Sequence, residues 1–382
     1  MILPGLIDVH AHLPQYPMVG RVEEALLPWL QRHVFPCEQA FRADKPCLRE
    51  ELDAFFSELA AHGTTTALLY AAVWGDSCHL AFEAAERSGL RVIMGKVMMD
   101  RGSYGLGLRD TAERTRRISL AECASLIGDW HGRDGGRLEY ALTPRFALSC
   151  THRMLREAAK LAADHGCLVQ THLSENAEEV RQVASLFPQA QDYASVYAQA
   201  DVLGARAVLA HCVHLSAAEI ELLATSGSAV AHCPTSNLFL NSGLCPLDRL
   251  QGAGLRVGLG SDVAGGPELN LWQVMRSAIE TQKARRFYDA TVPELTPAAA
   301  FHLATQGGAD ALGKGNYLGS LTPGKDADLV VLDLNRVLPT GGRFVPNTAL
   351  SADQTIALCI YRASAPAVLQ TWVRGRRVFP RP

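Results

Sequence analysis

Hydrophobic and polar positions follow two alternating patterns along most of the chain. Short apolar runs rich in β-branched residues predict strands at Leu3–His10, Thr64–Tyr70, Leu90–Met98, Leu138–Thr143, Leu168–Leu173, Ala207–Val213, Ser228–Cys233 and Leu255–Gly260. Between these runs, apolar residues at helical spacing predict helices at Cys47–Ala61, Cys78–Glu86, Leu120–Trp130, Met154–His165, Glu178–Leu186, Ala217–Ala224 and Trp272–Lys283. The pattern therefore contains about eight strand-then-helix units.

The alternation of strands and helices favours a parallel sheet, because each crossover helix then covers one face of the sheet. About eight such units over roughly 300 residues fit a closed (β/α)8 TIM-like barrel better than an open sheet. An open doubly wound sheet is the competing architecture, but no glycine-rich dinucleotide fingerprint follows an early strand. We therefore predict an α/β fold built on a (β/α)8 barrel.

The C-terminal part of the chain has a different pattern. After a helical segment at Thr296–Leu312, a turn region with glycine and proline precedes strand-like runs at Ala327–Leu334 and Val368–Phe379. We predict a barrel domain over residues 1–315 and a small β domain over residues 316–382.

Composition and charge narrow the class of protein. The chain has 382 residues, 48% hydrophobic and 20% charged, which excludes a disordered or fibrous protein and allows a substantial core. A formal charge of -3 gives no general electrostatic footprint for nucleic acids or anionic membranes. No apolar run approaches the roughly 18–20 residues that span a bilayer, and the start lacks a signal peptide. Ten scattered cysteines suit reduced thiols, so we predict a cytoplasmic protein without nucleic-acid or membrane partners.

Histidine and aspartate residues recur where the predicted strands end. His10 and His12 close the first strand, and alternate residues of a strand point to the same face. Further residues of this kind follow later strands, namely His172, His211, His232 and Asp262. Functional side chains of such barrels converge at the carboxyl ends of the strands. Imidazoles plus a carboxylate suit Zn²⁺ or Fe²⁺, and such an ion lowers the pKa of its water toward about 7.

Three further residues lie beside this predicted metal site. Glu175 follows His172 by three positions and can carry protons as a general acid and base. Arg145 and Phe146 follow the fourth strand, where a fixed cation and an aromatic face suit a planar heterocycle. That strand end carries no lysine to bridge two ions, so one metal is favoured over two.

Several motifs together resemble the amidohydrolase superfamily, and within it the purine and triazine aminohydrolase branch that includes the guanine deaminases. The motifs are Pro4-Gly-Leu-Ile-Asp-Val-His-Ala-His12 with Pro14-Gln15, Thr143-Pro-Arg-Phe146, Gln170-Thr-His-Leu-Ser-Glu-Asn176, Ala210-His-Cys-Val-His-Leu-Ser216, Ala231-His-Cys-Pro-Thr-Ser-Asn237 and Gly258-Leu-Gly-Ser-Asp-Val-Ala-Gly-Gly266. They run through nearly the whole barrel. Three of these motifs are more specific than those shared by the whole superfamily: Pro-Gln, Arg-Phe and His-Leu-Ser-Glu-Asn. They point to the purine branch.

The resemblance implies specific roles. One zinc ion per subunit would be bound by four residues: His10, His12, His172 and Asp262. Glu175, His211 and Asp262 would be catalytic, with His211 contacting the metal-bound hydroxide or the substrate. The guanine ring would be held by Gln15, Arg145, Phe146 and His172. The implied reaction converts guanine, a small-molecule purine, and water into xanthine and ammonia. A homodimer is expected by analogy.

Two alternative functions remain open, and the sequence departs from the family's pattern in two places. A related aminohydrolase or chlorohydrolase could act on 8-oxoguanine, a pterin or a triazine, and a non-catalytic barrel subunit is the third reading. Related enzymes carry several dozen residues before the Pro4-Gly-Leu-Ile-Asp8 motif, so we expect an N-terminally truncated small β domain, from a mis-assigned start codon or a truncated product. The loop after Asp262, Gly265-Gly-Pro-Glu-Leu-Asn270, replaces small hydroxyl residues that are usual in the family, which leaves recognition of the ring edge less defined than the metal site.

Overall fold

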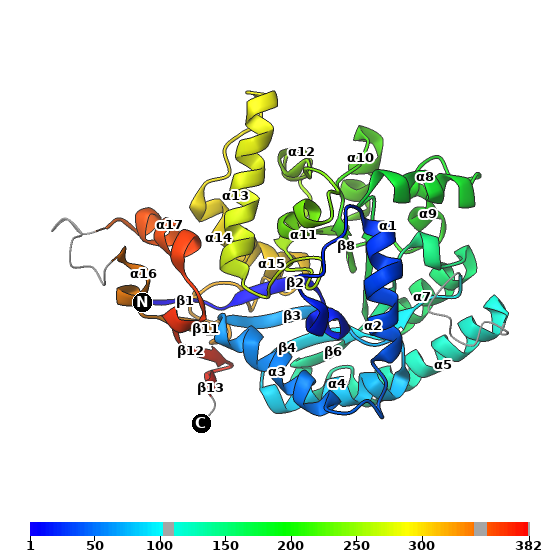
Figure 1. Cartoon of the computed structure of the whole chain (residues 1–382), viewed down its shortest axis with the longest axis horizontal. Helices are drawn as coiled ribbons and strands as arrows, with labels where there is room; N and C mark the ends of the chain where they lie inside the picture. The colour runs from blue at the N-terminus through cyan, green and yellow to red at the C-terminus, as the bar shows by residue number, and fades with distance from the viewer. Residues whose placement is uncertain (102–110, 340–349, 381–382) are drawn as a thin grey trace.

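A parallel β-barrel forms the centre of the computed structural model, which describes residues 1–101, 111–339 and 350–380 (Figure 1). Within these ranges, eight parallel strands follow one another around the barrel in chain order: β2 (Leu6–His12), β3 (Thr64–Tyr70), β4 (Arg91–Gly95), β6 (Leu138–Pro144), β7 (Leu168–Leu173), β8 (Ala207–His211), β9 (Ala229–His232) and β10 (Arg256–Leu259). A short strand, β5 (Val97–Met98), pairs with the end of β6. The predicted barrel fold is confirmed.

Helices connect successive strands and cover the outside of the barrel (Figure 1). The principal ones are α3 (Leu48–Ala61), α4 (Gly75–Ser88), α5 (Ala112–Trp130), α7 (His152–His165), α8 (Ala177–Leu186), α9 (Tyr193–Gln199), α10 (Ala217–Ser226), α11 (Pro234–Phe239), α12 (Leu247–Gly252) and α13 (Leu271–Tyr288). The local sequence determines where several of these helices begin. Thr151 caps α7, and capping boxes begin α8 at Asn176 and α10 at Ser216, because these side chains accept otherwise unpaired backbone N–H groups.

The barrel closes between its first and last strands, β2 and β10. Two backbone hydrogen bonds join their carboxyl ends: the N–H of Asp262 donates to His10, and the N–H of His12 donates to Val263. At the opposite end, the short helix α15 (Gln306–Ala311) packs against the interior apolar cluster that contains Ile7 and Val9. The interior is therefore filled at its base, and the open end lies at the strand carboxyl termini.

A small antiparallel sheet lies beside the barrel, with strand order β1 (Ile2–Pro4), β11 (Leu329–Leu332), β12 (Val368–Val373) and β13 (Arg376–Phe379). The predicted opening strand thus splits in two, because β1 pairs with β11 and only the residues after Gly5 enter the barrel. The helix α17 (Ala352–Arg362) packs instead against α13 and α14 (Pro297–Leu303). We retain a barrel plus a small β domain as a proposal, with residues 340–349 and 381–382 outside the described ranges.

A helical segment that the sequence pattern did not predict covers the open end of the barrel. It comprises η1 (Leu13–Met18), α1 (Leu26–Trp29), the π-helical turn η2 (Leu30–Val34) and α2 (Phe35–Ala40). Its side chains Gln15, Leu26, Trp29 and Leu30 line a pocket above the strands. This segment therefore separates the carboxyl ends of the strands from bulk solvent.

Across the described ranges, the helices are too short or too polar for a membrane span.

Candidate metal centre and purine pocket

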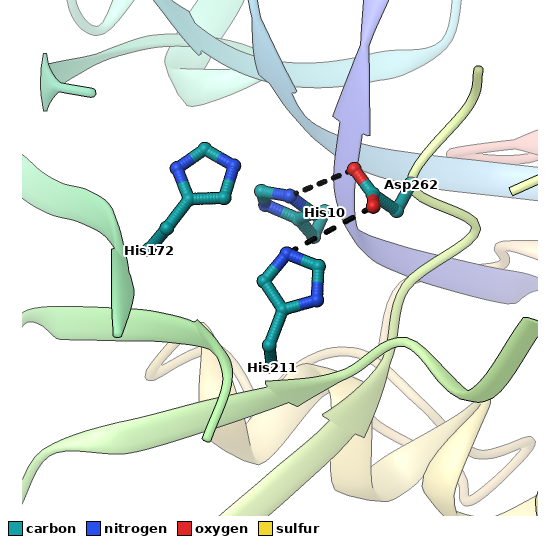
Figure 2. A group of neighbouring side chains, drawn as sticks. All are labelled: His10, His172, His211 and Asp262. Atoms are coloured by element: carbon teal, nitrogen blue, oxygen red, sulfur yellow. Dashed lines mark ion pairs between the residues drawn. The ribbon is translucent and has the colours of Figure 1, made fainter. Parts of the chain in front are cut away.

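Four side chains from different strands converge at the carboxyl end of the barrel (Figure 2). His10 comes from β2, His172 from β7 and His211 from β8, while Asp262 follows β10. One ligand atom from each lies within 4.8 Å of every other, and all four residues are buried. The carboxylate faces two imidazoles, with Asp262 Oδ1 3.1 Å from His10 Nε2 and Oδ2 3.8 Å from His211 Nε2.

The structure also places His12 in this cluster. Its Nε2 lies 3.1 Å from His172 Nε2 and 3.3 Å from Asp262 Oδ1. A register irregularity in β2 between Asp8 and Ala11 accompanies this arrangement, in which Val9 packs in the barrel interior while His10 and His12 both reach the cluster. Five candidate ligands are therefore brought together. The group whose ligand atoms all lie within 4.8 Å of one another contains His211, whereas the set expected from sequence contains His12 in its place.

Hydrogen bonds orient two of these imidazoles so that Nε2 faces the centre. The Nδ1–H of His172 donates to the backbone oxygen of Arg145 at 2.6 Å, because a carbonyl can only accept. The Nδ1–H of His211 donates to Asn237 Oδ1 at 2.9 Å. In a neutral ring, Nε2 then carries the lone pair, as a metal ligand must.

Burial disfavours the protonated form of His12 and His172. It lowers the pKa of His12 to about 3 and holds that of His172 well below its usual value. Among the described residues, His10 Nε2 and His211 Nε2 are buried without a hydrogen-bond partner. Unpartnered nitrogens beside a buried carboxylate are the donor set that a divalent cation such as Zn²⁺ requires, so these residues fit a metal ion.

The two carboxyl groups of the site have pKa values shifted in opposite directions. Although burial alone would raise the pKa of Asp262, the facing His10 imidazole and its neighbours hold it well below its usual range. Burial raises the pKa of Glu175 well above its usual value, and the nearby Asp262 charge adds to this. One carboxyl is thus suited to remain ionised as a ligand, and the other to exchange a proton.

Glu175 is held beside the cluster by its own loop. Its Oε2 lies 3.5 Å from His211 Nε2, and its Oε1 lies 3.5 Å from Ser242 Oγ. Its backbone N–H donates to Glu179 Oε2 at 2.9 Å, and the Tyr193 hydroxyl donates to the other oxygen of Glu179 at 2.7 Å. These contacts fix where the Glu175 side chain enters the pocket.

The backbone beneath the site adopts conformations that side chains usually avoid. His211 and Asp262 have φ values of 72° and 49°, and Ser174, just before Glu175, has 50°. Such left-handed residues cost free energy and persist where the surrounding fold holds them. The loop after Asp262 is equally tight, since a Cβ on Gly265 would lie 2.8 Å from Asp262 Oδ2 and from Ser236 Oγ. A side chain at position 265 would therefore crowd the Asp262 carboxylate and the Ser236 hydroxyl.

The predicted ring-binding residues line the same pocket as the cluster. Gln15, Arg145 and Phe146 share its wall with His12, His172, Glu175, His211 and Asp262. The rings of Phe146 and His172 meet edge to face, with centroids 6.3 Å apart. A flat, polar heterocycle can therefore contact aromatic, cationic and candidate metal-binding groups at once.

Sequence reasoning missed three buried residues of this site. Glu38 pairs with Arg145, Asn237 orients His211, and Tyr70 packs against the rings of His12 and His172 with centroids 4.4 and 4.8 Å away. Asn237 ends the Ala231–Asn237 motif, and Tyr70 ends the predicted strand Thr64–Tyr70. Glu38 carries no comparable signal, because it lies in the helical segment that the pattern did not reveal.

A sequence model described as "Amidohydrolase family" matches residues 1–378. The chain belongs to the amidohydrolase family. Within that family it is 37% identical to guanine deaminase from Escherichia coli (strain K12) over 388 aligned positions, which cover 100% of this chain and 83% of that protein.

Solved structures of other amidohydrolase-like chains agree with this assignment. The E. coli guanine deaminase structure has a TM-score of 0.90 and covers 100% of this chain and 85% of that one. A guanine deaminase from C. acetobutylicum, solved with bound guanine, has a TM-score of 0.90 and 29% identity, covering 99% and 87%. An adenosine deaminase from Xanthomonas campestris, solved with bound zinc, has a TM-score of 0.82 and 26% identity, covering 98% and 80%.

Proposed function

We propose that this protein hydrolyses guanine to xanthine and ammonia. Water supplies the oxygen that replaces the exocyclic nitrogen at C2, and that nitrogen leaves as ammonia. The observation that carries the proposal is the convergence of the candidate metal ligands with Gln15, Arg145 and Phe146 on one pocket. The similarity to guanine deaminases over the whole chain supports guanine as the substrate.

The metal we propose is one Zn²⁺ per subunit, held by His10, His12, His172 and Asp262. The nitrogen and oxygen donors suit zinc, and the zinc bound in the related adenosine deaminase supports this choice. Fe²⁺ accepts the same donors, so the metal must be identified by direct measurement. When bound, the ion supplies Lewis acidity and lowers the pKa of water into the physiological range.

The protein's own groups perform the proton transfers. We assign Glu175 to protonate the ring nitrogen next to C2, since its raised pKa lets it hold and release a proton. Asp262 helps to move a proton onto the departing amine. His211 contacts the substrate side of the centre, where its Nε2 lies between Glu175 and Asp262 at 3.5 and 3.8 Å.

The purine ring is held by the opposite wall of the pocket. Arg145 supplies donors to the ring carbonyl, Gln15 hydrogen-bonds the neighbouring edge, and Phe146 packs on the ring face. His172 borders the same space through its ring. The enclosure excludes bulk water, which strengthens each of these polar contacts.

The test is ammonia release by purified protein, with guanine compared against 8-oxoguanine, a pterin and a chlorinated triazine. Chloride release is measured for the triazine, because a chlorohydrolase expels chloride instead of ammonia. We expect the highest kcat/KM for guanine and about one zinc per chain by elemental analysis. A flat or inverted substrate order would overturn the assignment in favour of another aminohydrolase or a chlorohydrolase. Absence of turnover on every compound, with metal bound, would favour a non-catalytic barrel.

The proposal also places the protein in the cytoplasm, acting on a small-molecule purine. The described structure contains ten free cysteines, as expected for a reducing compartment. A homodimer stays a prediction, which size-exclusion chromatography with light scattering would test.

A further inference from the structure

A buried glutamate joins the two polar residues assigned above to the purine ring. Glu38, on α2, is 1% exposed. Its Oε1 accepts a hydrogen bond from Gln15 Nε2 at 2.7 Å. Arg145 Nη1 lies 2.9 Å from Oε1 and 2.7 Å from Oε2 of the same carboxylate. One acidic group therefore holds both pocket residues from the side of the covering helical segment.

The contact with Glu38 decides which way the Gln15 amide points. A carboxylate paired with a guanidinium can only accept hydrogen bonds, so the amide must turn its Nε2 toward Glu38. Gln15 Oε1 then lies on the other side, 3.4 Å from the backbone N of Ala264. An amide oxygen has two lone pairs, and it can accept a second hydrogen bond from a ligand in the pocket.

The same contact fixes the guanidinium of Arg145. An arginine side chain loses rotational freedom about several bonds when it is held, and the contact of Nη1 with both oxygens of Glu38 supplies this constraint before a ligand arrives. Phe35 adds to this, since its ring lies under the guanidinium with 5.5 Å between the Arg145 Cζ and the ring centroid. Donor and acceptor positions on the pocket wall are thus set in the free protein.

We propose that Glu38 is a positioning residue that fixes the hydrogen-bonding polarity of this wall, with Arg145 as donor and Gln15 Oε1 as acceptor. The ring edge that matches is a carbonyl beside an N–H group, as in the lactam edge of 6-oxopurines. The inference rests on the proposed function for the identity of the pocket, and it adds the residue that selects the 6-oxo form. Glu38 acts through its two neighbours and does not itself contact the ring.

The variant Glu38→Gln separates polarity from size. A glutamine at position 38 presents one oxygen and one NH₂ group where two acceptor oxygens stood. Its NH₂ would face a donor, either Arg145 or Gln15, and the Gln15 amide relieves this conflict by rotating through 180°. Gln15 would then turn its Nε2 away from position 38, and the wall would lose its acceptor for the ring N–H.

The experiment measures binding of two purines that carry no amine to lose. Hypoxanthine has the lactam edge and purine lacks the 6-oxygen, and their dissociation constants for the zinc-loaded protein are compared by calorimetry. We expect the wild-type preference for hypoxanthine to fall at least about tenfold in Glu38→Gln, the scale of one hydrogen bond to a charged group. With guanine, KM should rise by about the same factor while kcat stays within roughly threefold.

Asp328→Asn provides the matched control. Asp328 is also buried and ion-paired with an arginine, Arg91, but it lies beside the small sheet. This variant should lower the melting temperature and keep the wild-type preference, because it breaks a buried ion pair away from the pocket. If Glu38→Gln does not fold, Glu38→Asp decides, since it keeps the charge but retracts the carboxylate by one methylene and should still lose preference.

The outcomes separate the two proposals. If wild-type protein deaminates guanine and both Glu38 variants keep the full hypoxanthine preference, the role of Glu38 is overturned and the proposed function stands. If wild-type protein does not deaminate guanine but prefers hypoxanthine, and the preference falls in the variants, the proposed function fails and the role of Glu38 stands. A preference that falls equally in Asp328→Asn would show a merely structural effect and would also overturn the inference.

Discussion

Replacing Glu175 by glutamine tests the proton-transfer role most directly. Glutamine keeps the size of the side chain and can still accept a hydrogen bond from Ser242 Oγ, which lies 3.5 Å away. It cannot take up and release a proton at the ring nitrogen. The candidate metal group contains His10, His172, His211 and Asp262 but not Glu175, so the metal should stay bound.

The expected loss follows from how the residue is buried. Glu175 is 4% exposed, so bulk water cannot readily replace its carboxyl as a proton carrier. Removing a general acid and base usually costs about 10²–10⁴-fold in rate, or roughly 3–5 kcal/mol at 1.36 kcal/mol per tenfold. The melting temperature should not fall, because burial favours the neutral form of Glu175 and glutamine is a neutral side chain of the same size.

Ammonia release gives kcat, and elemental analysis gives the metal content of the same preparation. Glu178→Gln is the matched control, since that glutamate lies three positions further on, 46% exposed, and pairs with Arg181. The control should retain wild-type kcat. Turnover of Glu175→Gln within about threefold of wild type would refute the assigned role, and loss of metal would show that Glu175 acts as a ligand instead.

Three further predictions concern the cluster and the core. His172→Ala removes a nitrogen that lies 3.1 Å from His12 Nε2, so zinc per chain should fall well below one by elemental analysis; an unchanged count would remove His172 from the ligand set. Asn237→Leu leaves the Nδ1–H of His211 without its acceptor and should lower metal affinity or kcat by about 10–100-fold, and unaltered values of both would contradict the orienting role. Trp272→Ala empties a fully buried site and should cost about 3–5 kcal/mol in denaturant unfolding, whereas a loss under about 1 kcal/mol would contradict tight packing there.

The local sequence pattern predicted the barrel well because each strand has a recognisable apolar run of only a few residues. The strands Thr64–Tyr70 and Leu168–Leu173 have the bounds that their apolar runs indicate. The expected single helix over Thr296–Leu312 is instead two helices, α14 and α15. The break at Thr305 lets Gly308 approach Ile7 at the barrel base, where a Cβ would lie 3.0 Å from the Ile7 side chain. That contact joins distant parts of the chain, so no local pattern could reveal it.

Some residues of the site could likewise be predicted from local sequence motifs, whereas others depend on contacts between distant parts of the chain. The motifs placed His10, His172, His211 and Asp262 at strand ends, and the geometry of parallel strands predicts that such residues meet. The pairing of Glu38 with Arg145 spans 107 positions and depends on a covering segment without regular periodicity. The pairing of β1 with β11 in the small sheet is equally non-local, since β11 lies more than 300 positions after β1 in the chain.

The join between the first and last barrel strands has one consequence of its own. His10 and His12 lie on one side of this join and Asp262 on the other, and two main-chain hydrogen bonds connect the sides at these same residues. A cation held by residues of both sides would crosslink the first and last strands of the barrel. Loss of the ion would then loosen the cylinder at its opening, and hydrogen exchange at the amides of His12 and Asp262 would report it first.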